Sequence, residues 1–351
     1  DDFDSIPERA YDVFGLMSSI PSNYDPYNRT YSGIWDGTFQ TNWTDNPAWI
    51  LYDLIKNKRY GLGENIPESY LETLKWSLYS IAQYCDENIT ITDEISEPRY
   101  TCSCVINSQQ EAYDLLNTIV STFRGMLYPV GEGLMAVADR LTDPVINVGP
   151  ANVIDGMFVY RGPARRTIHT AAYVTWNNPD DGYKLNTALY ENQEGIARYG
   201  YKIDKINAVG ACSKSLAIRL AKWKILTEVM APDTVTYRAS FDHLNVMPGD
   251  IINVSDPAYT SEELIGRILS ITDNEDSTHT VELDRSVARI GGDESILQLT
   301  LPDQTILSID VSVVSTTTGT EIIVPSAELT TMPVTGAMWL LSKETVRPRM
   351  W

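Results

Sequence analysis

The most constraining feature of the sequence is the stretch over residues 46–63, NPAWILYDLIKNKRYGLG. Asn46 can accept a hydrogen bond from the first free amide of a helix, and Pro47 suits the first helical position because no donor is needed there. Apolar residues then cover more than one face of the expected helix: Trp49, Ile50, Leu51, Leu54 and Ile55. A helix that is apolar on several sides is typical of a fold's interior.

The same stretch also predicts where its helix ends. Lys56, Lys58 and Arg59 fall in the expected last turn, where positive charge complements the helix dipole. Tyr60 and Gly61 follow, and Gly61 can take the left-handed conformation of a C-cap. The stretch therefore predicts a buried helix with its own start and stop signals.

Two helical patterns and short alternating segments follow the first helix. Residues 67–85 and 108–124 carry apolar side chains at spacings of three and four, and residues 126–139 read as two strands joined at a glycine turn. We therefore predict a small α+β domain over residues 46–150, with helices on one face of an antiparallel sheet.

An aromatic segment precedes this domain. Residues 1–45 show no sustained period and predict an extended connecting arm with short strands. Its large side chains are Tyr27, Tyr31, Trp35, Phe39 and Trp43. Two interpretations stay open: these side chains are buried on the chain's own next domain, or they contact a neighbouring subunit.

From residue 151 onward the sequence is mostly β in character. Residues 234–241 alternate cleanly, and a long helix is predicted at 213–230 with Ser213 as its cap. Pro248, Gly249 and Asp250 predict a turn that feeds a strand. Short strands with regular turn signals then suggest a barrel that carries inserted hairpins.

The fold class expected for the whole chain is α+β and mainly β. A small α+β domain is followed by a β-barrel-type hub domain over residues 151–351, with one long helix and an inserted β-hairpin subdomain at about 262–335. The sequence begins with Asp1 and stops in what reads as mid-strand, so we expect it to be a piece of a longer polypeptide.

Composition narrows the possible functions. The net charge is −20 over 351 residues, which argues against nucleic-acid binding because phosphate contacts need clustered Lys and Arg. No apolar run is long enough to span a bilayer. Of the four cysteines, Cys102 and Cys104 are expected about 7 Å apart on one face of a strand, at the limit for a bridge. Reduced, structural thiols are expected.

No pattern in the sequence predicts a catalytic site or a cofactor. The carboxylate pairs Asp180–Asp181 and Glu262–Glu263 read as solvated turn or strand-entrance charges. The histidines, His169, His243 and His279, each stand alone in the sequence and read as structural.

Two further motifs are weak. Gly131, Gly133 and Ala136 match a degenerate dinucleotide fingerprint, but Pro144 arrives before the long helix that should follow, so a hairpin turn is predicted. A calcium loop through Asp273, Asn274 and Asp276 lacks the EF-hand order, which favours an acidic hairpin tip. We therefore predict neither a metal site nor a catalytic residue.

The stretch over residues 46–63 also resembles the core motif of the tip attachment, or host specificity, protein J family of lambda-like tailed phages and of the related baseplate hub proteins. The likeness extends from about Tyr11 to the C-terminus, and the Pro248-Gly249-Asp250 phrase recurs in barrel domains of such hubs. The motif positions carried over, all as structural residues, are Asn46, Pro47, Trp49, Tyr60, Gly61, Pro248, Gly249 and Asp250.

The resemblance implies a non-enzymatic structural part of a phage or prophage tail tip. Three copies would form a hub that closes the distal end of the tail tube, with an acidic lumen that repels DNA. It would contact the distal tail and tail tube proteins and the tape measure protein, and it would reach a host receptor only through C-terminal parts outside this sequence. The expected location is the virion, after assembly in the bacterial cytoplasm.

Two other classes of protein are weighed against this interpretation. A tail-associated cell-wall or glycan hydrolase would fit the abundant Asp, Tyr and Trp, and it requires an open cleft with two facing carboxylates. A receptor-binding module would adsorb to cells by itself, whereas a hub fragment would not.

Overall fold

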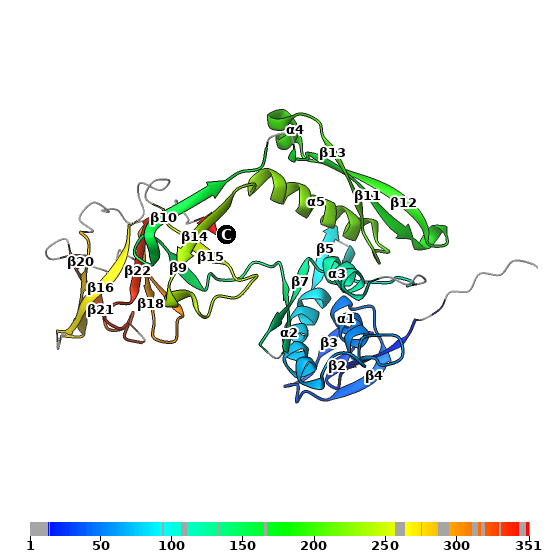
Figure 1. Ribbon diagram of the computed structural model, residues 1–351, viewed down its shortest axis with the longest axis horizontal. Helices are drawn as coiled ribbons and strands as arrows, with labels where there is room; N and C mark the ends of the chain where they lie inside the picture. Colours follow the sequence, from blue (N-terminus) through cyan, green and yellow to red (C-terminus); the bar gives the residue numbers. More distant parts are fainter. Residues whose placement is uncertain are drawn as a thin grey trace, which may run out of the picture. The chain divides into compact units, whose positions relative to one another are not determined.

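The chain forms two compact units, and each unit combines two segments that are separate in the sequence (Figure 1). Unit 1 contains residues 1–139 and 164–232, and unit 2 contains residues 140–163 and 233–351. The computed structural model describes residues 13, 15–92, 95–106, 111–131, 133–164, 167–256, 264–274, 276–286, 295–310, 315–316, 320–329, 331–343 and 349–350.

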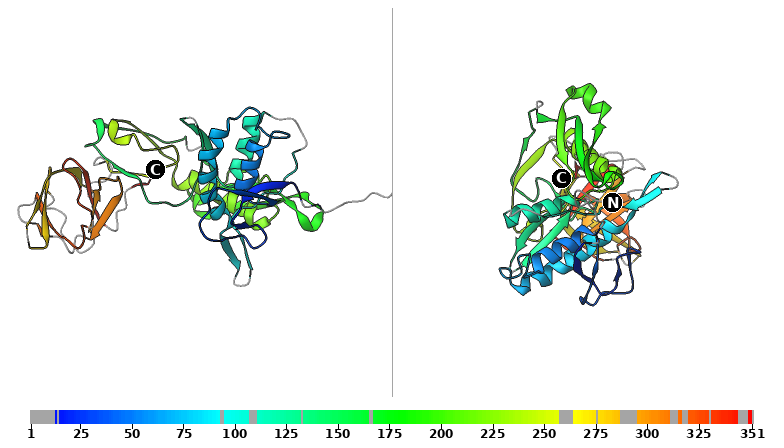
Figure 2. Two further views of the ribbon diagram at one scale, coloured as in Figure 1. Left: turned by 90° about the horizontal axis from the view of Figure 1, so that it is seen from below. Right: turned by 90° about the vertical axis from the view of Figure 1, so that its right-hand side faces the viewer.

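One part of unit 1 consists of three helices and a β-hairpin. The helices are α1 (Pro47–Lys56), α2 (Glu68–Asp86) and α3 (Ala112–Thr122), and Figure 2 shows them side by side in blue to cyan. The hairpin of β7 (Gly125–Val130) and β8 (Gly133–Ala138) packs on α2. The glycine fingerprint thus lies in a hairpin, as predicted.

Short antiparallel pairs complete this part of unit 1. They are β1 (Met17–Pro21) with β4 (Phe39–Trp43), β2 (Tyr24–Asp25) with β3 (Thr30–Tyr31), and β5 (Asn88–Thr92) with β6 (Ile95–Pro98). Tyr24 and Trp35 are 2 % and 4 % exposed and belong to the same core as Trp49 of α1. The aromatic segment is therefore packed on the chain's own helices.

A second sheet belongs to unit 1 and is formed by its later segment, residues 164–232. Its strands are β11 (Ala171–Asn178), β12 (Lys184–Glu191) and β13 (Ile203–Asn207), in the order β12-β11-β13. β11 runs antiparallel to β12 and parallel to β13. A 3-10 turn (η2, Pro179–Asp181) and helix α4 (Gln193–Tyr199) connect these strands.

Helix α5 (Lys214–Met230) covers one face of this sheet (Figure 1). Ser213 caps it by accepting a hydrogen bond from the amide of Leu216, as predicted. The buried residues of α5 share one core with α1, α2 and α3. For this reason residues 164–232 cluster with unit 1, whereas the sequence placed the long helix in the barrel domain.

Unit 2 is built from strands. A ribbon pairs β10 (Val153–Arg161) with β14 (Thr234–Ala239), which is followed by a 3-10 turn (η3, Phe241–His243). A small sheet has the order β23-β15-β9, formed by Arg349–Met350, Ile252–Val254 and Ile146–Val148.

The main sheet of unit 2 has the order β19-β18-β22-β16-β17-β21-β20. Its strands are β16 (Leu264–Asp273), β17 (Thr278–Leu283), β18 (Ser295–Thr300), β19 (Ile306–Asp310), β20 (Ser315–Thr316), β21 (Glu321–Pro325) and β22 (Met338–Lys343). Leu297 of β18 and Trp339 of β22 are fully buried in its core. The sheet is curled into a half-barrel, with β19 and β20 as its edge strands in the part of the chain described.

The predicted α+β and mainly β fold class is confirmed. The strands predicted as an inserted hairpin subdomain share one sheet with β22, because β16 and β18 both pair with that strand. No helix among the described residues is long and apolar enough to cross a membrane.

Candidate functional site

The stretch that dominates the sequence forms helix α1, which lies inside the core of unit 1. Its start was predicted correctly: Asn46 accepts a hydrogen bond of 3.0 Å from the amide of Ala48, and Pro47 occupies the first turn. Trp49, Leu51 and Ile55 are fully buried. Burying three large apolar side chains stabilises the fold by about 1.5–3 kcal/mol for each, measured against exposure to water.

The predicted end of the helix was wrong in detail. α1 ends at Lys56, so Lys58 and Arg59 lie beyond its last turn, and the capping residue Asn57 has an extended conformation. Gly61 does not have a positive φ. Its role is steric, because a Cβ at this position would lie 2.0 Å from the carbonyl oxygen of Leu54. The loop after α1 folds back onto the helix, and the amide of Leu62 donates to that carbonyl at 2.9 Å.

Tyr60, in the same loop, also contacts α1. The Tyr60 hydroxyl donates a short hydrogen bond to Asp53 of α1, and the carboxylate of Asp53 also accepts from the backbone of Ser19 at 3.3 Å. Burial, followed by the hydrogen bond to Asp53, raises the pKa of Tyr60 to about 12. Tyr60 therefore ties the loop to α1 through Asp53, and Asp53 in turn contacts the N-terminal segment; a structural role for Tyr60 and Gly61 is our interpretation of these contacts.

A buried polar network surrounds the start of α1. The carboxylate of Asp86, at the end of α2, accepts hydrogen bonds of 2.9 Å from Arg29, Tyr31 and Asn46. Arg29 also donates to both oxygens of Asp45, at 2.5 and 2.6 Å. The network joins the N-terminal segment, the N-cap of α1 and the C-terminus of α2, and sequence reasoning did not find it because its members are far apart in the chain.

Burial is the main cause of the raised pKa values of Asp86 and Tyr31 in this network. Burial raises the pKa of Asp86 above the ordinary carboxyl value, although hydrogen bonds from Tyr31 and Arg29 act in the opposite direction. Burial and the nearby charge of Asp86 raise the pKa of Tyr31, so its hydroxyl stays protonated and remains a donor. The Arg29 pair provides the charge compensation that a buried carboxylate requires.

The second motif forms the predicted turn in unit 2. Gly249 has a φ of +94°, a conformation that favours glycine. The amide of Asp250 donates to the carbonyl of Met247 at 3.1 Å, and the amide of Met247 donates back to the Asp250 carboxylate at 2.7 Å. Pro248 lies within this closed turn, which leads into β15. A structural role for the three motif residues remains our interpretation of this geometry.

The cysteines are free, and three of them lie near one another. The expected strand around Cys102 and Cys104 is absent, since residues 101–106 have no regular secondary structure. The sulfur atoms of these two cysteines are 3.9 Å apart, and the Cys212 sulfur lies 4.0 Å from the carbonyl oxygen of Ser103. A hydrogen bond from Cys102 lowers the pKa of the exposed Cys104 thiol to about 7. Burial raises the pKa of the Cys85 thiol, which lies in the core.

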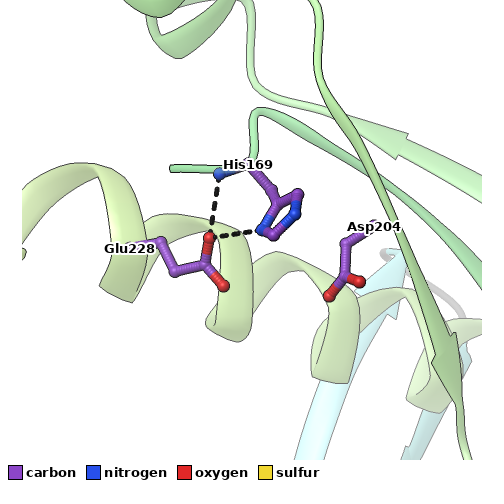
Figure 3. Close-up of side chains that lie close together, drawn as sticks. All are labelled: His169, Asp204 and Glu228. Carbon is purple, nitrogen blue, oxygen red and sulfur yellow. Dashed lines mark hydrogen bonds and ion pairs between the residues drawn. The ribbon is translucent and has the colours of Figure 1, made fainter. Parts of the chain in front are cut away.

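One group of potential metal ligands is present among the described residues. His169, Asp204 and Glu228 each offer a ligand atom, and these atoms lie within 4.8 Å of one another (Figure 3). The amide and the Nδ1 atom of His169 both lie 2.9 Å from Oε2 of Glu228. His169 stands alone in the sequence, because its partners in this group are contributed by β13 and α5 rather than by its own segment.

The other residues considered from the sequence have local partners. Asp181 pairs with Lys184 at 3.2 Å in the η2 turn, and Asp276 accepts from the amide of Thr278 at a hairpin tip. His279 lies 3.0 Å from the hydroxyl of Ser326, and His243 packs beside Tyr237. Glu262 and Glu263 lie outside the described residues.

Comparison with known proteins gives a consistent result. A family described as a putative phage tail protein matches residues 111–271. The chain is 37 % identical over 270 residues to tip attachment protein J of Escherichia phage SECphi27, which covers 76 % of this chain and 22 % of that protein. It is 32 % identical over 271 residues to tip attachment protein J of Escherichia phage SECphi4, covering 76 % and 24 %. The chain thus spans less than a quarter of each relative's length. The expected resemblance to the tip attachment protein J family is confirmed.

Proposed function

Because this chain belongs to the tip attachment proteins of tailed phages, we propose that it is the central, hub-forming region of a tail tip protein. Its role is structural: it closes the distal end of the tail tube and links the tube to host-attachment parts. The observation that carries this proposal is the similarity over 76 % of the chain to two proteins named for tip attachment. The region that matches the family, residues 111–271, includes parts of both units.

The proposed assembly is a homotrimer that stacks on the distal tail proteins and contacts the tape measure protein. A C₃ ring requires a head-to-tail interface on each protomer, and a longer polypeptide would carry the receptor-contacting parts further from the ring. The net charge of −20 supports an interior that repels DNA phosphate. The free cysteines are compatible with assembly in the reducing bacterial cytoplasm.

The role proposed here is mechanical and non-catalytic. Packed interfaces would hold the tip closed until receptor engagement shifts the ring to an open arrangement. The buried network around Asp86 supports this mechanical role, because it connects the N-terminal segment to α1 and α2 within one protomer.

The oligomer is tested by sedimentation velocity of the purified chain over a wide concentration range, with negative-stain imaging of the heaviest species. We expect a monomer that associates into three-fold rings with a central hole as concentration rises. An obligate dimer would contradict the hub proposal.

The location is tested in virions. A short epitope is inserted at Gly182, which lies in the turn after η2, has a φ of +60° and has no atom within 4 Å of where a Cβ would lie. Phage carrying the full-length tagged protein are then labelled with gold. We expect label at the distal end of the tail. Label along the tail tube or at the head would overturn the proposal.

A further inference from the structure

The side chains of His169, Asp204 and Glu228 converge from three separate elements of unit 1. His169 precedes β11, Asp204 lies on β13 and Glu228 lies in the last turn of α5. Figure 3 shows the imidazole ring between the two carboxylates. One ligand atom of each residue lies within 4.8 Å of the other two, so small side-chain rotations bring all three to a common ion.

Backbone groups hold these side chains in place. The amide of His169 donates to Oε2 of Glu228 at 2.9 Å, and the amide of Lys205 donates to Oδ1 of Asp204 at 2.8 Å. Outer-shell hydrogen bonds of this kind orient metal ligands and limit their freedom before the ion arrives. The side chains of His169, Glu228 and Asp204 are 35 %, 28 % and 20 % exposed, so solvent and ions can reach the cluster.

The charges of the cluster are incompletely balanced. The ammonium of Lys224 pairs with the carboxylate of Asp204. The two carboxylates and this ammonium sum to a charge of −1, before the imidazole is counted. A divalent cation would compensate this charge more fully than Lys224 does, and the partly buried setting strengthens the attraction.

We propose that His169, Asp204 and Glu228 form a binding site for a divalent transition-metal cation of the zinc class. One imidazole nitrogen and two carboxylate oxygens suit Zn²⁺, Co²⁺ or Mn²⁺, whereas Ca²⁺ and Mg²⁺ prefer oxygen ligands alone. Lys224 swings away from Asp204 when the ion binds, and water completes the coordination. The ion joins β13 and the segment before β11 to α5, so its binding free energy adds to the stability of unit 1. This site does not depend on the tail-tip proposal.

The test uses the purified chain with Cys104→Ser and Cys212→Ser, because free thiolates also bind zinc and cobalt. After treatment with a chelator, the protein is titrated with ZnCl₂ by calorimetry and with CoCl₂ by visible absorption. We expect the double serine variant to bind one ion per chain and to melt at a higher temperature when the ion is bound. Loss of binding in the double serine variant would assign the ion to the thiols and overturn the proposal.

Three variants locate the ion. Glu228→Gln and His169→Ala are each expected to weaken binding by more than about 10–100-fold, the loss that mutation of an outer-shell partner already causes. Lys224→Met removes the competing ammonium and is expected to tighten binding while leaving every ligand in place. Since Lys224→Met predicts a gain, it remains informative if a ligand variant folds poorly.

Asp181→Asn is the matched control for these variants. It removes a carboxylate that pairs with a lysine in the same sheet, at 3.2 Å, and it should leave the affinity unchanged. Equal binding by the ligand variants and this control, or weaker binding by Lys224→Met, would show that the cluster is an ion-pair clamp only and would overturn the proposal.

Discussion

The side-chain amide of Asn46 donates a hydrogen bond of 2.9 Å to the carboxylate of Asp86, 40 residues further along the chain. The same amide donates to the carbonyl of Ala82 at 3.0 Å, while its oxygen caps α1 through Ala48. One fully buried side chain therefore starts α1 and ties it to the last turn of α2. A cap residue that also makes tertiary contacts has a larger effect on stability than an exposed cap.

Asn46→Asp separates these two roles, because aspartate keeps the cap acceptor but replaces the amide donor. The new carboxylate would face Asp86 in a buried setting, where two like charges are strongly unfavourable. We expect the free energy of unfolding to fall by about 2–4 kcal/mol, measured by urea unfolding at pH 7.

The control for this variant is Asn192→Asp at the N-cap of α4. Asn192 accepts from the amide of Gly195 at 2.9 Å, and aspartate can accept the same bond. The change in unfolding free energy there should stay within about 0.5 kcal/mol, since Asn and Asp cap helices equally well. Equal effects at positions 46 and 192 would refute the tertiary role of Asn46.

Asp86 should give unit 1 a distinctive pH dependence. Its folded pKa is raised by burial, so the native state takes up the proton at a higher pH than the unfolded chain does. The contribution of this group to stability is therefore complete below the unfolded pKa and is lost as pH rises through the folded pKa. Relative to Asp86→Asn, the wild-type chain should gain stability as pH falls from 7 toward about 4.

The measurement is urea unfolding of the wild type and of Asp86→Asn at matched pH values. Other carboxylates titrate in both proteins, so the difference between the two curves isolates Asp86. If the wild type instead loses stability relative to Asp86→Asn as the pH falls, the hydrogen bonds and charge of Arg29 outweigh burial, and the pKa of Asp86 is depressed in the folded state.

Gly61 is expected to tolerate no side chain. A Cβ at this position would lie 2.0 Å from the Leu54 carbonyl oxygen, which is held in the backbone of α1. We expect Gly61→Ala to lower the free energy of unfolding by about 1–3 kcal/mol through displacement of the loop after the helix. Gly15→Ala, where an added Cβ meets no atom within 4 Å, is the control and should be neutral. Thermal unfolding of both variants decides whether the loop contact matters.

Local chemistry explains which features the sequence could reveal. The start of α1 was predictable because Asn46 and Pro47 act on the helix that they begin. Its end was not, because Gly61 serves a contact with Leu54 across the loop rather than a helix cap. The unit that contains α5 was also not predictable, since apolar spacing shows that a helix is buried but not against which partner.

The metal-ligand cluster illustrates the same limit. His169, Asp204 and Glu228 are separated by 35 and 24 residues along the chain, and no spacing rule connects them. They meet because β11 and β13 pair in parallel and α5 packs on that sheet. The tail-tip interpretation was predictable because it depends on a contiguous motif.

Cys104 should be the most reactive thiol at neutral pH. It is exposed, and the hydrogen bond from Cys102 lowers its pKa to about 7, so about half of it is thiolate at that pH. Burial raises the pKa of Cys85 and of Cys212, and those thiols should react more slowly. Labelling with iodoacetamide between pH 6 and 9, followed by peptide mass spectrometry, gives the rate at each cysteine. In Cys102→Ala the midpoint for Cys104 should move upward toward 9, whereas an unchanged midpoint would show that Cys102 does not stabilise the thiolate.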